Sequence, residues 1–282
     1  MRHAIVRADG IDLACTVAGS GPPVVLVHGL ACGRRMWVRQ VRALSRDFTV
    51  VAFDQRGHGR SSAPDRAADY SPGRLGRDLA ALLDALGLER VHLVGFSLGG
   101  GPALGVALSR PERVLSLTLA DVGAGAESPM LLSSTARRWI AVGRERGADA
   151  LAEEMLRGEF FRSYAERGAR ERCHMRALIR STPLPGLLHT LSEVLAKRTS
   201  PFRMTGTLRS VRVPTLVLRG DADEVCRASS KLFAATIPGA RLATVPGAGH
   251  MAPLEAPDAF TAAVREFVGA VPPTPGRARG RG

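Results

Sequence analysis

The sequence predicts an α/β fold built on a mostly parallel sheet, and three features lead to this class. Near-continuous runs of Val and Leu, without polar alternation, are typical of strands that are covered on both faces. Between these runs, apolar residues recur every three or four positions, which indicates amphipathic helices. Strands that alternate with helices in this way favour a parallel sheet with helices on both of its faces.

Eight segments have the composition of strands. The first two are joined by the turn sequence ADG, which is typical of a hairpin, and the other six are short apolar runs. In chain order they are His3–Arg7, Ile11–Val17, Val24–Val27, Phe48–Asp54, Arg90–Gly95, Ser116–Asp121, Pro214–Gly220 and Ala240–Val245.

The helical patterns are clearest at Leu75–Leu86 and Phe260–Val268, and one long region breaks the alternation of strands and helices. Residues 123–206 contain helix-like segments and no strand-like run, so we expect an inserted helical cap there. Residues 1–122 and 207–270 then form the core. Most bulky apolar residues of the cap should pack between its own helices, and a few, among them Trp139 and Phe161, are expected to line a substrate pocket.

The composition argues against several classes of protein. The formal net charge is +13, but the basic residues are almost all arginines spread along the chain, without interleaved aromatic residues, so nucleic-acid binding is not predicted. No apolar run reaches the roughly 18 residues of a membrane-spanning helix, and the N-terminus has no apolar signal-peptide core. The sequence GRARGRG within residues 271–282 predicts a disordered basic tail. Nothing in the sequence indicates the oligomeric state.

The cysteines are scattered, without a CxxC pair, which favours reduced thiols in a cytoplasmic protein and argues against a zinc site. They are Cys15, Cys32, Cys173 and Cys226.

The segment VHLVGFSLGG places a serine between glycines at the end of a predicted strand. A strand that ends in Gly-x-Ser-x-Gly and leads into a helix is typical of a nucleophile elbow. Gly95 and Gly99 flank Ser97 at positions where side chains would collide as the chain folds back. The serine itself is forced into a strained conformation, at a cost of about 1–3 kcal/mol, and its hydroxyl is left exposed. Ser97 is therefore the predicted nucleophile.

A serine nucleophile requires a base and an orienting carboxylate, and in this architecture both follow it in the chain. His250 lies just after the last predicted strand and is the expected base. Asp221 and Asp223 follow the strand Pro214–Gly220, and Asp223 is preferred because a longer loop lets it turn towards the histidine. Asp121 is the main rival, and Asp54 is interpreted as an organiser of its loop.

Hydrolysis also requires N–H donors for the oxyanion. The backbone of Leu98, directly after the nucleophile, supplies the first. The segment LVHGLACG after an early strand is expected to supply the second from Leu30, with His28 and Gly29 allowing the chain to turn tightly beside the substrate.

Together these motifs resemble the α/β-hydrolase superfamily over residues 3–270. The resemblance rests on HG at 28–29, DQRGHGRSS at 54–62, GFSLGG at 95–100, GDAD at 220–223 and GAGHMAPLEAP at 247–257. It implies an eight-stranded α/β-hydrolase fold with Ser97 as nucleophile, His250 as base and Asp223 as acid. Members of the superfamily with an aspartate nucleophile are disfavoured, because this elbow carries a serine.

Within the superfamily, the chain is similar to 3-oxoadipate enol-lactonase-like hydrolases and related carboxylesterases. This similarity implies hydrolysis of small carboxylic esters or lactones through an acyl-enzyme, without a metal or an organic cofactor. Three alternatives remain open: C–C bond hydrolysis of dienoic diketo acids, cofactor-free perhydrolysis or haloperoxidase activity on the same triad, and a ligand receptor without catalysis.

Overall fold

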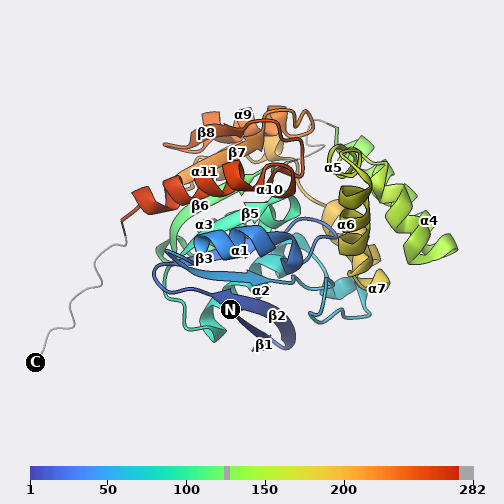
Figure 1. Cartoon of the computed structure of the whole chain (residues 1–282), viewed down its shortest axis with the longest axis horizontal. Coiled ribbons are helices and arrows are strands. Elements are labelled where there is room, and N and C mark those ends of the chain that lie inside the picture. The colour runs from blue at the N-terminus through green and yellow to red at the C-terminus, as the bar shows by residue number, and fades with distance from the viewer. Residues whose placement is uncertain (124–127, 273–282) are drawn as a thin grey trace, which may run out of the picture.

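The computed structural model describes residues 1–123 and 128–272, and its centre is an eight-stranded sheet (Figure 1). The strand order is β1-β2-β4-β3-β5-β6-β7-β8. β1 and β2 form the predicted antiparallel hairpin, β2 runs antiparallel to β4, and all the remaining neighbours are parallel. The strands are β1 (Arg2–Ala8), β2 (Ile11–Ala18), β3 (Pro23–Val27), β4 (Thr49–Phe53), β5 (Val91–Phe96), β6 (Val114–Ala120), β7 (Thr215–Gly220) and β8 (Arg241–Val245).

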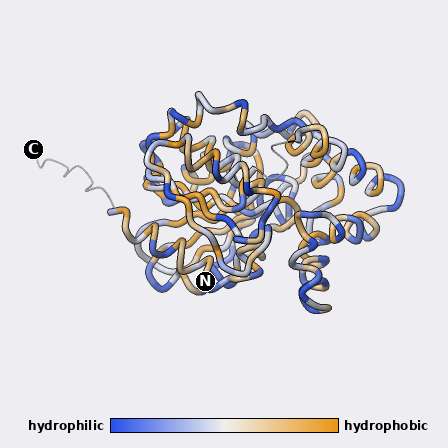
Figure 2. The backbone as a smooth tube through the Cα atoms, turned by 90° about the horizontal axis from the view of Figure 1, so that it is seen from above, coloured by the Kyte–Doolittle hydropathy of each residue, from blue (hydrophilic) through white to orange (hydrophobic). Residues whose placement is uncertain are grey.

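Helices cover both faces of this sheet, as the apolar strand runs predict. α1 (Val38–Leu44) and α11 (Pro257–Ala270) lie on one face, and α2 (Pro72–Ala85), α3 (Gly100–Ser109) and α9 (Arg227–Thr236) lie on the other. Figure 2 shows that the most apolar stretches of the backbone run through the centre of the molecule, with hydrophilic stretches towards its edge. The mostly parallel sheet with helices on both faces confirms the predicted fold class.

The chain between β6 and β7 forms a helical layer of its own, where the sequence predicts a cap. Its helices up to residue 189 are grouped at one side of the molecule in Figure 1, whereas residues 201–208 pack against α9. The helices of the region are, in chain order, α4 (Pro129–Leu156), α5 (Arg162–Ala165), α6 (Ala169–Arg180), α7 (Leu184–His189) and α8 (Thr205–Leu208), with a π-helical turn η5 (Thr190–Leu195) and a 3₁₀ turn η6 (Pro201–Arg203). Apolar side chains of this cap share one continuous cluster with the α1 and α11 face of the sheet.

Short elements complete the fold between the main ones. They are the 3₁₀ turns η1 (Arg34–Trp37), η2 (Ala67–Asp69), η3 (Ser97–Gly99) and η4 (Pro111–Arg113), and the short helix α10 (Ala252–Glu255). Of the predicted basic tail, residues 273–282 lie outside the described part of the chain. No helix among the described residues is long and apolar enough to span a bilayer.

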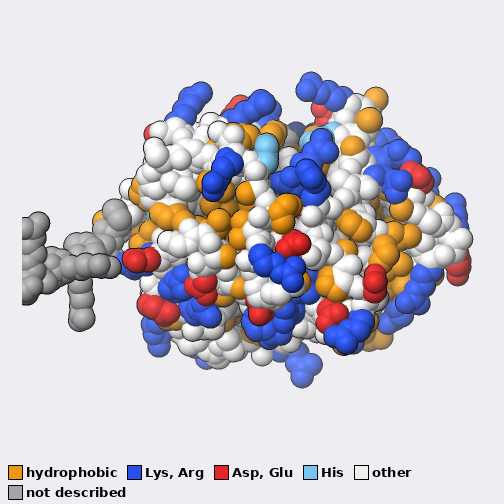
Figure 3. All heavy atoms as spheres, turned by 90° about the horizontal axis from the view of Figure 1, so that it is seen from below, with side chains coloured by type: hydrophobic (Ala, Val, Ile, Leu, Met, Phe, Trp, Pro, Cys, Tyr) orange, Lys and Arg blue, Asp and Glu red, His pale blue; other side chains and the backbone are white. Residues whose placement is uncertain are grey.

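The positive charge is distributed over the surface. On the face shown in Figure 3, Lys and Arg side chains are spread widely, and Asp and Glu side chains lie between them. Several arginines form ion pairs, such as Arg110 with Asp84 and Arg176 with Asp149. All four cysteines are free thiols, three of them buried.

The predicted functional residues follow the carboxyl ends of neighbouring parallel strands. Ser97 follows β5, Asp121 follows β6, Asp223 comes shortly after β7, and His250 comes shortly after β8. In an open parallel sheet these ends meet along one edge, where ligands bind. The topology therefore brings residues that are far apart in sequence to a single site.

Candidate active site

Ser97 occupies a strained turn between β5 and α3. Its φ is +50°, in the left-handed region that side chains other than glycine rarely adopt. A Cβ on Gly95 would lie 2.7 Å from the Cα of Gly100, and one on Gly99 would lie 2.3 Å from the carbonyl oxygen of Val27. Only glycine fits at both flanks, so the close turn that exposes Ser97 depends on both residues.

Ser97, His250 and Asp223 form a continuous hydrogen-bonded row. Ser97 Oγ lies 3.1 Å from His250 Nε2, and His250 Nδ1 lies 3.0 Å from Asp223 Oδ2. His250 is 3% exposed and Asp223 is 2% exposed, whereas Ser97 is partly open to solvent. With the Nδ1 proton donated to Asp223, Nε2 is the nitrogen that accepts the serine proton. The structure thus brings together the three side chains singled out in the sequence.

Asp223 is held as a carboxylate by several donors. Burial alone would raise its pKa, but the charge and hydrogen bond of His250, with smaller contributions from Asp121 and Cys226, lower it to about 2. The N–H of Cys226 donates to Oδ1 at 3.3 Å. Asp221, the alternative in the same loop, is exposed.

The other two carboxylates weighed in the sequence have different surroundings. Asp54 accepts hydrogen bonds from the N–H groups of Arg34, at 2.6 Å, and Arg60, at 3.0 Å, so it organises its loop as predicted. Asp121 lies behind Asp223, and no hydrogen bond joins it to His250 among the described residues.

The loop after β3 closes over the serine from the other side. A Cβ on Gly29 would lie 3.2 Å from Ser97 Cβ and 2.8 Å from the ring of Phe96. His28 is fully buried; its Nδ1 donates to the carbonyl of Gly29 at 2.7 Å, and its Nε2 accepts from the N–H of Gln55 at 2.9 Å. Burial, with a contribution from His58, lowers the pKa of His28 well below its usual value. His28 is therefore a neutral residue that shapes the loop.

The two predicted oxyanion donors lie in segments that border the serine. Leu98 is the residue after Ser97 in η3, and Leu30 follows Gly29 in the loop after β3. Hydrogen bonds fix the Leu30 loop, because the N–H of Ala31 donates to His58 Nε2 at 3.2 Å.

A cavity of about 240 Å³ opens beside Ser97, between α3 and the C-terminal part of the cap, residues 194–204. Its lining is mainly apolar, with Lys197 and Arg198 at one wall. Lys197 is bonded to Glu193 on the adjoining turn, at 2.5 Å. Apart from Ser97 and Leu98, the lining includes Gly101, Leu104, Leu108, Val122, Val194, Met204 and Phe233. No local sequence pattern marks the lining, since it comes from five separate segments that include Pro72 and Leu75 of α2.

Trp139 and Phe161 are placed differently from the pocket role expected of them. Both are buried, and neither borders this cavity. They pack against Phe160, whose ring centroid lies 5.9 Å from that of Trp139 and 6.4 Å from that of Phe161. Phe160 in turn lies 5.5 Å from the ring of His250. Phe160 is thus the side chain of this aromatic cluster that contacts His250, and Trp139 and Phe161 contact Phe160.

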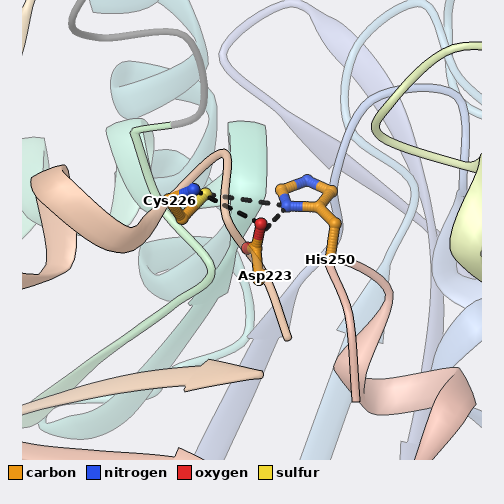
Figure 4. Close-up of side chains that lie close together, drawn as sticks. All are labelled: Asp223, Cys226 and His250. Carbon is orange, nitrogen blue, oxygen red and sulfur yellow. Dashed lines mark hydrogen bonds and ion pairs between the residues drawn. The ribbon is translucent and has the colours of Figure 1, made fainter. Parts of the chain in front are cut away.

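Asp223, Cys226 and His250 also have the residue types of a metal-binding group (Figure 4). Their ligand atoms lie within 4.8 Å of one another, and Cys226 Sγ is 3.6 Å from His250 Nδ1. The same atoms are engaged in the Asp223–His250 hydrogen bond. Burial, followed by the charge of Asp223, raises the pKa of the Cys226 thiol well above its usual value. A metal would require the thiolate, so these surroundings oppose metal binding.

The chain is similar in sequence to a known protein family and to individual proteins within it. A family model described as "alpha/beta hydrolase fold" matches residues 22–257. A putative carbamate hydrolase RutD of Pseudomonas savastanoi pv. phaseolicola is 29% identical over 273 residues, which cover 96% of this chain and 99% of that protein.

Two solved structures are similar over nearly the whole chain. An enol-lactonase from Burkholderia xenovorans LB400 has a TM-score of 0.82 and 28% identity, and the match covers 95% of this chain and 100% of that one. A thermophilic esterase from Thermogutta terrifontis has a TM-score of 0.83 and 30% identity, with 96% and 99% covered.

Proposed function

The chain belongs to the alpha/beta hydrolase fold family, and from this premise we propose that it is a serine hydrolase of small carboxylic esters or lactones. The observation that carries the proposal is the row Ser97–His250–Asp223, with both links at about 3 Å and with the serine in a strained, partly exposed turn. This arrangement has the geometry of a Ser-His-Asp triad, which is recognised by the positions and roles of its groups.

In the proposed reaction, His250 Nε2 takes the proton of Ser97 as Oγ attacks the acyl carbon. The N–H groups of Leu30 and Leu98 stabilise the oxyanion of the tetrahedral intermediate. His250 then gives the proton to the departing alcohol oxygen, and an acyl-enzyme remains on Ser97. Water, deprotonated by His250, attacks this ester; His250 then returns the proton to Ser97 Oγ as the Oγ–acyl bond breaks and the acid leaves, while Asp223 stabilises the imidazolium formed in each step.

The cavity supports a small, partly apolar substrate. Its volume of about 240 Å³ is below the range of roughly 300–1,000 Å³ that is typical of sites for drug-sized ligands. The similar proteins are named as a putative carbamate hydrolase, an enol-lactonase and an esterase, and carbamates, lactones and esters all contain a carbonyl carbon open to attack by a nucleophile. We therefore place esters and lactones first and include carbamates as a third acyl class.

The first prediction concerns the nucleophile. Ser97→Ala should lower kcat for an aryl acetate by at least about 10³-fold, because the triad residues act as a unit. A fluorophosphonate probe should label Ser97 and no other serine, as read by mass spectrometry. The control is Ser109→Ala, an exposed serine at the end of α3 that bonds only to the carbonyl of Gly105 and should keep both activity and labelling.

The substrate panel contains an aryl ester, a lactone, a carbamate and a dienoic diketo acid, with and without hydrogen peroxide. Turnover of the ester or lactone supports the proposal. Turnover of the diketo acid alone would replace it with C–C bond hydrolysis, and a requirement for peroxide would replace it with perhydrolysis. Binding without any turnover or probe labelling would indicate a receptor and would overturn the assignment of Ser97.

A further inference from the structure

A second buried carboxyl group, that of Asp121, lies directly behind Asp223. Asp121 follows β6, is 0% exposed, and has a φ of +48°. Its Oδ1 accepts the N–H of Gly220 at 2.8 Å, but its Oδ2 has no donor among the described residues. The two residues are neighbours, because Cys226 donates its N–H to Asp223 Oδ1 and its thiol to the carbonyl of Asp121, and the charge of Asp223 acts on the Asp121 carboxyl group. An acceptor that faces another acceptor in a buried site is unfavourable unless one of them carries a proton.

The surroundings decide which of the two carries the proton. Asp223 accepts from His250 Nδ1 at 3.0 Å and from the N–H of Cys226 at 3.3 Å, so its charge is well solvated by donors. Asp121 accepts a single backbone N–H and forms no ion pair among the described residues. Two carboxylates in contact do not both ionise in such a site. The proton therefore belongs on Asp121.

We propose that Asp121 is kept as a neutral carboxylic acid that donates a hydrogen bond to Asp223, and that it is a positioning residue for the reaction proposed above. The donated bond occupies one lone pair of Asp223 and leaves Oδ2 directed at His250 Nδ1. The positioning role of Asp121 rests on the proposed function. The protonation of Asp121 is a property of the folded protein and does not depend on that function.

The backbone around Asp121 keeps this donor in place. Its N–H donates to the carbonyl of Leu218 at 2.8 Å, and its own carbonyl accepts the thiol of Cys226 at 3.2 Å. The left-handed φ is one that Asp and Asn tolerate better than most residues. These contacts tie the ends of β6 and β7 together at the residue that supports Asp223.

The ionisable groups around Asp121 act in the same direction. Burial, and then the charge of Asp223, raises the pKa of Asp121 well above its usual value, and Glu255 adds to the shift. Cys226 also lies against Asp223 as a protonated thiol, with Arg198 near it. His250 is the positive partner when it is protonated, and it bonds to Asp223 and not to Asp121.

Infrared spectroscopy tests the position of the proton directly. The difference spectrum between the wild type and Asp121→Asn at pH 8 should contain the carbonyl band of a protonated carboxylic acid, shifted by deuterium exchange. Absence of that band would overturn the proposal. This measurement requires no substrate, so its outcome is separate from success or failure of the proposed function.

The pH profile of kcat/KM tests the positioning role. Asp121→Asn replaces one neutral donor with another, so the midpoint of the acid limb should not move. Asp121→Ala removes the donor, which makes Asp223 more basic and moves the midpoint upward, with a rate loss on the order of 10-fold. The asparagine variant should lose less rate than the alanine variant, which is rescue by the conservative change.

Two other outcomes for these variants would contradict the proposal. If Asp121 were ionised in the wild type, both variants would remove a negative charge near the imidazole and would move the midpoint downward. If the two variants behaved identically, the donated bond would have no positioning role. The matched control is Thr118→Val, a near-isosteric change at a buried position of the same strand whose hydroxyl has no described partner. Thr118→Val should leave the pH profile of kcat/KM unchanged. It measures the effect of a substitution in β6 that does not alter Asp121.

Discussion

At the scale of single residues, Asp121 combines a supporting role at the site with a cost in stability. Its folded-state pKa is raised by burial and by Asp223, so the folded protein holds a proton that the unfolded chain releases above pH 4 or so. A group of this kind lowers the free energy of unfolding progressively as the pH rises through that range. The asparagine variant keeps the shape of the side chain and removes the titration.

We therefore predict that Asp121→Asn is more stable than the wild type at neutral pH. The difference in free energy of unfolding should grow with pH above about 4, by at most about 1.4 kcal/mol per pH unit, and should be constant below it. Urea unfolding at pH 4, 6 and 8 measures this difference. A difference that does not depend on pH would mean that Asp121 is ionised in the folded state.

Asp223 and Asp221 give a second prediction at this scale. Asp223→Asn should lower kcat by roughly 10³–10⁴-fold, because an amide no longer stabilises the imidazolium and favours the wrong tautomer of His250. Asp221→Asn is the matched control, since this carboxylate is exposed in the same loop. Comparable losses in the two variants would show that the loop, and not the bond to His250, is what matters.

At the scale of elements, the elbow between β5 and α3 depends on close backbone contact. A methyl group on Gly99 would meet carbonyl oxygens of Val27 and His28 at 2.3 and 2.5 Å, and these belong to the backbone at the end of β3. Because backbone cannot yield as a flexible side chain does, the strand ends must separate to admit it. The close contact of Gly99 with the end of β3 therefore determines both the stability of the elbow and the exposure of the Ser97 hydroxyl.

The corresponding prediction is that Gly99→Ala lowers the free energy of unfolding by about 3 kcal/mol or more and reduces probe labelling of Ser97. Gly76→Ala in α2 is the control, because a Cβ there meets nothing within 4 Å. In a helix interior this change should stabilise the protein by about 0.5–1 kcal/mol. Equal effects of the two substitutions on thermal unfolding would contradict the crowding argument.

The cavity beside α3 gives a prediction about substrate choice. Gly101 lines it, and a Cβ added there meets no atom within 4 Å, so Gly101→Leu should fill part of the cavity without disturbing the helix. Relative kcat/KM for hexanoyl against acetyl esters should fall by about 10-fold or more, since each methylene contact is worth about 1–3 kcal/mol. Gly76→Leu, outside the cavity, should leave the ratio unaltered. An unaltered ratio in Gly101→Leu would place the acyl chain elsewhere.

At the scale of the whole molecule, local patterns in the sequence predicted the sheet and the row of site residues. Apolar runs marked six of the eight strands and a turn sequence marked the first two, and each residue of the row stands near the end of a strand. What could not be predicted depends on distant packing. The cavity is assembled from five separate segments, Trp139 and Phe161 pack against Phe160, and Asp121 meets Asp223 because β6 and β7 are neighbours. Residue type alone does not distinguish a pocket aromatic from a packed one.

Buried histidines set the response of the whole fold to acid. Burial is the main cause that lowers the pKa of His28 well below its usual value, that of His58 to a smaller extent, and that of His92 to about 4. All three are neutral in the folded protein, while the unfolded chain takes up protons below about pH 6.5. The unfolded state therefore binds more protons at these residues between pH 6.5 and 4, and the free energy of unfolding falls as the pH is lowered through this window.

Asp121 acts in the opposite sense over the same window, because there the folded state holds the additional proton. Burial lowers the pKa of His174 as well, so the histidines outnumber this one carboxyl and unfolding takes up protons in this window. Urea unfolding at half-unit steps from pH 4.5 to 7 measures this uptake as the slope of the free energy of unfolding against pH. His92→Gln should lower the slope by about one proton and Asp121→Asn should raise it by about one. A slope that His92→Gln does not alter would mean that His92 is charged within the fold, against the burial that surrounds it.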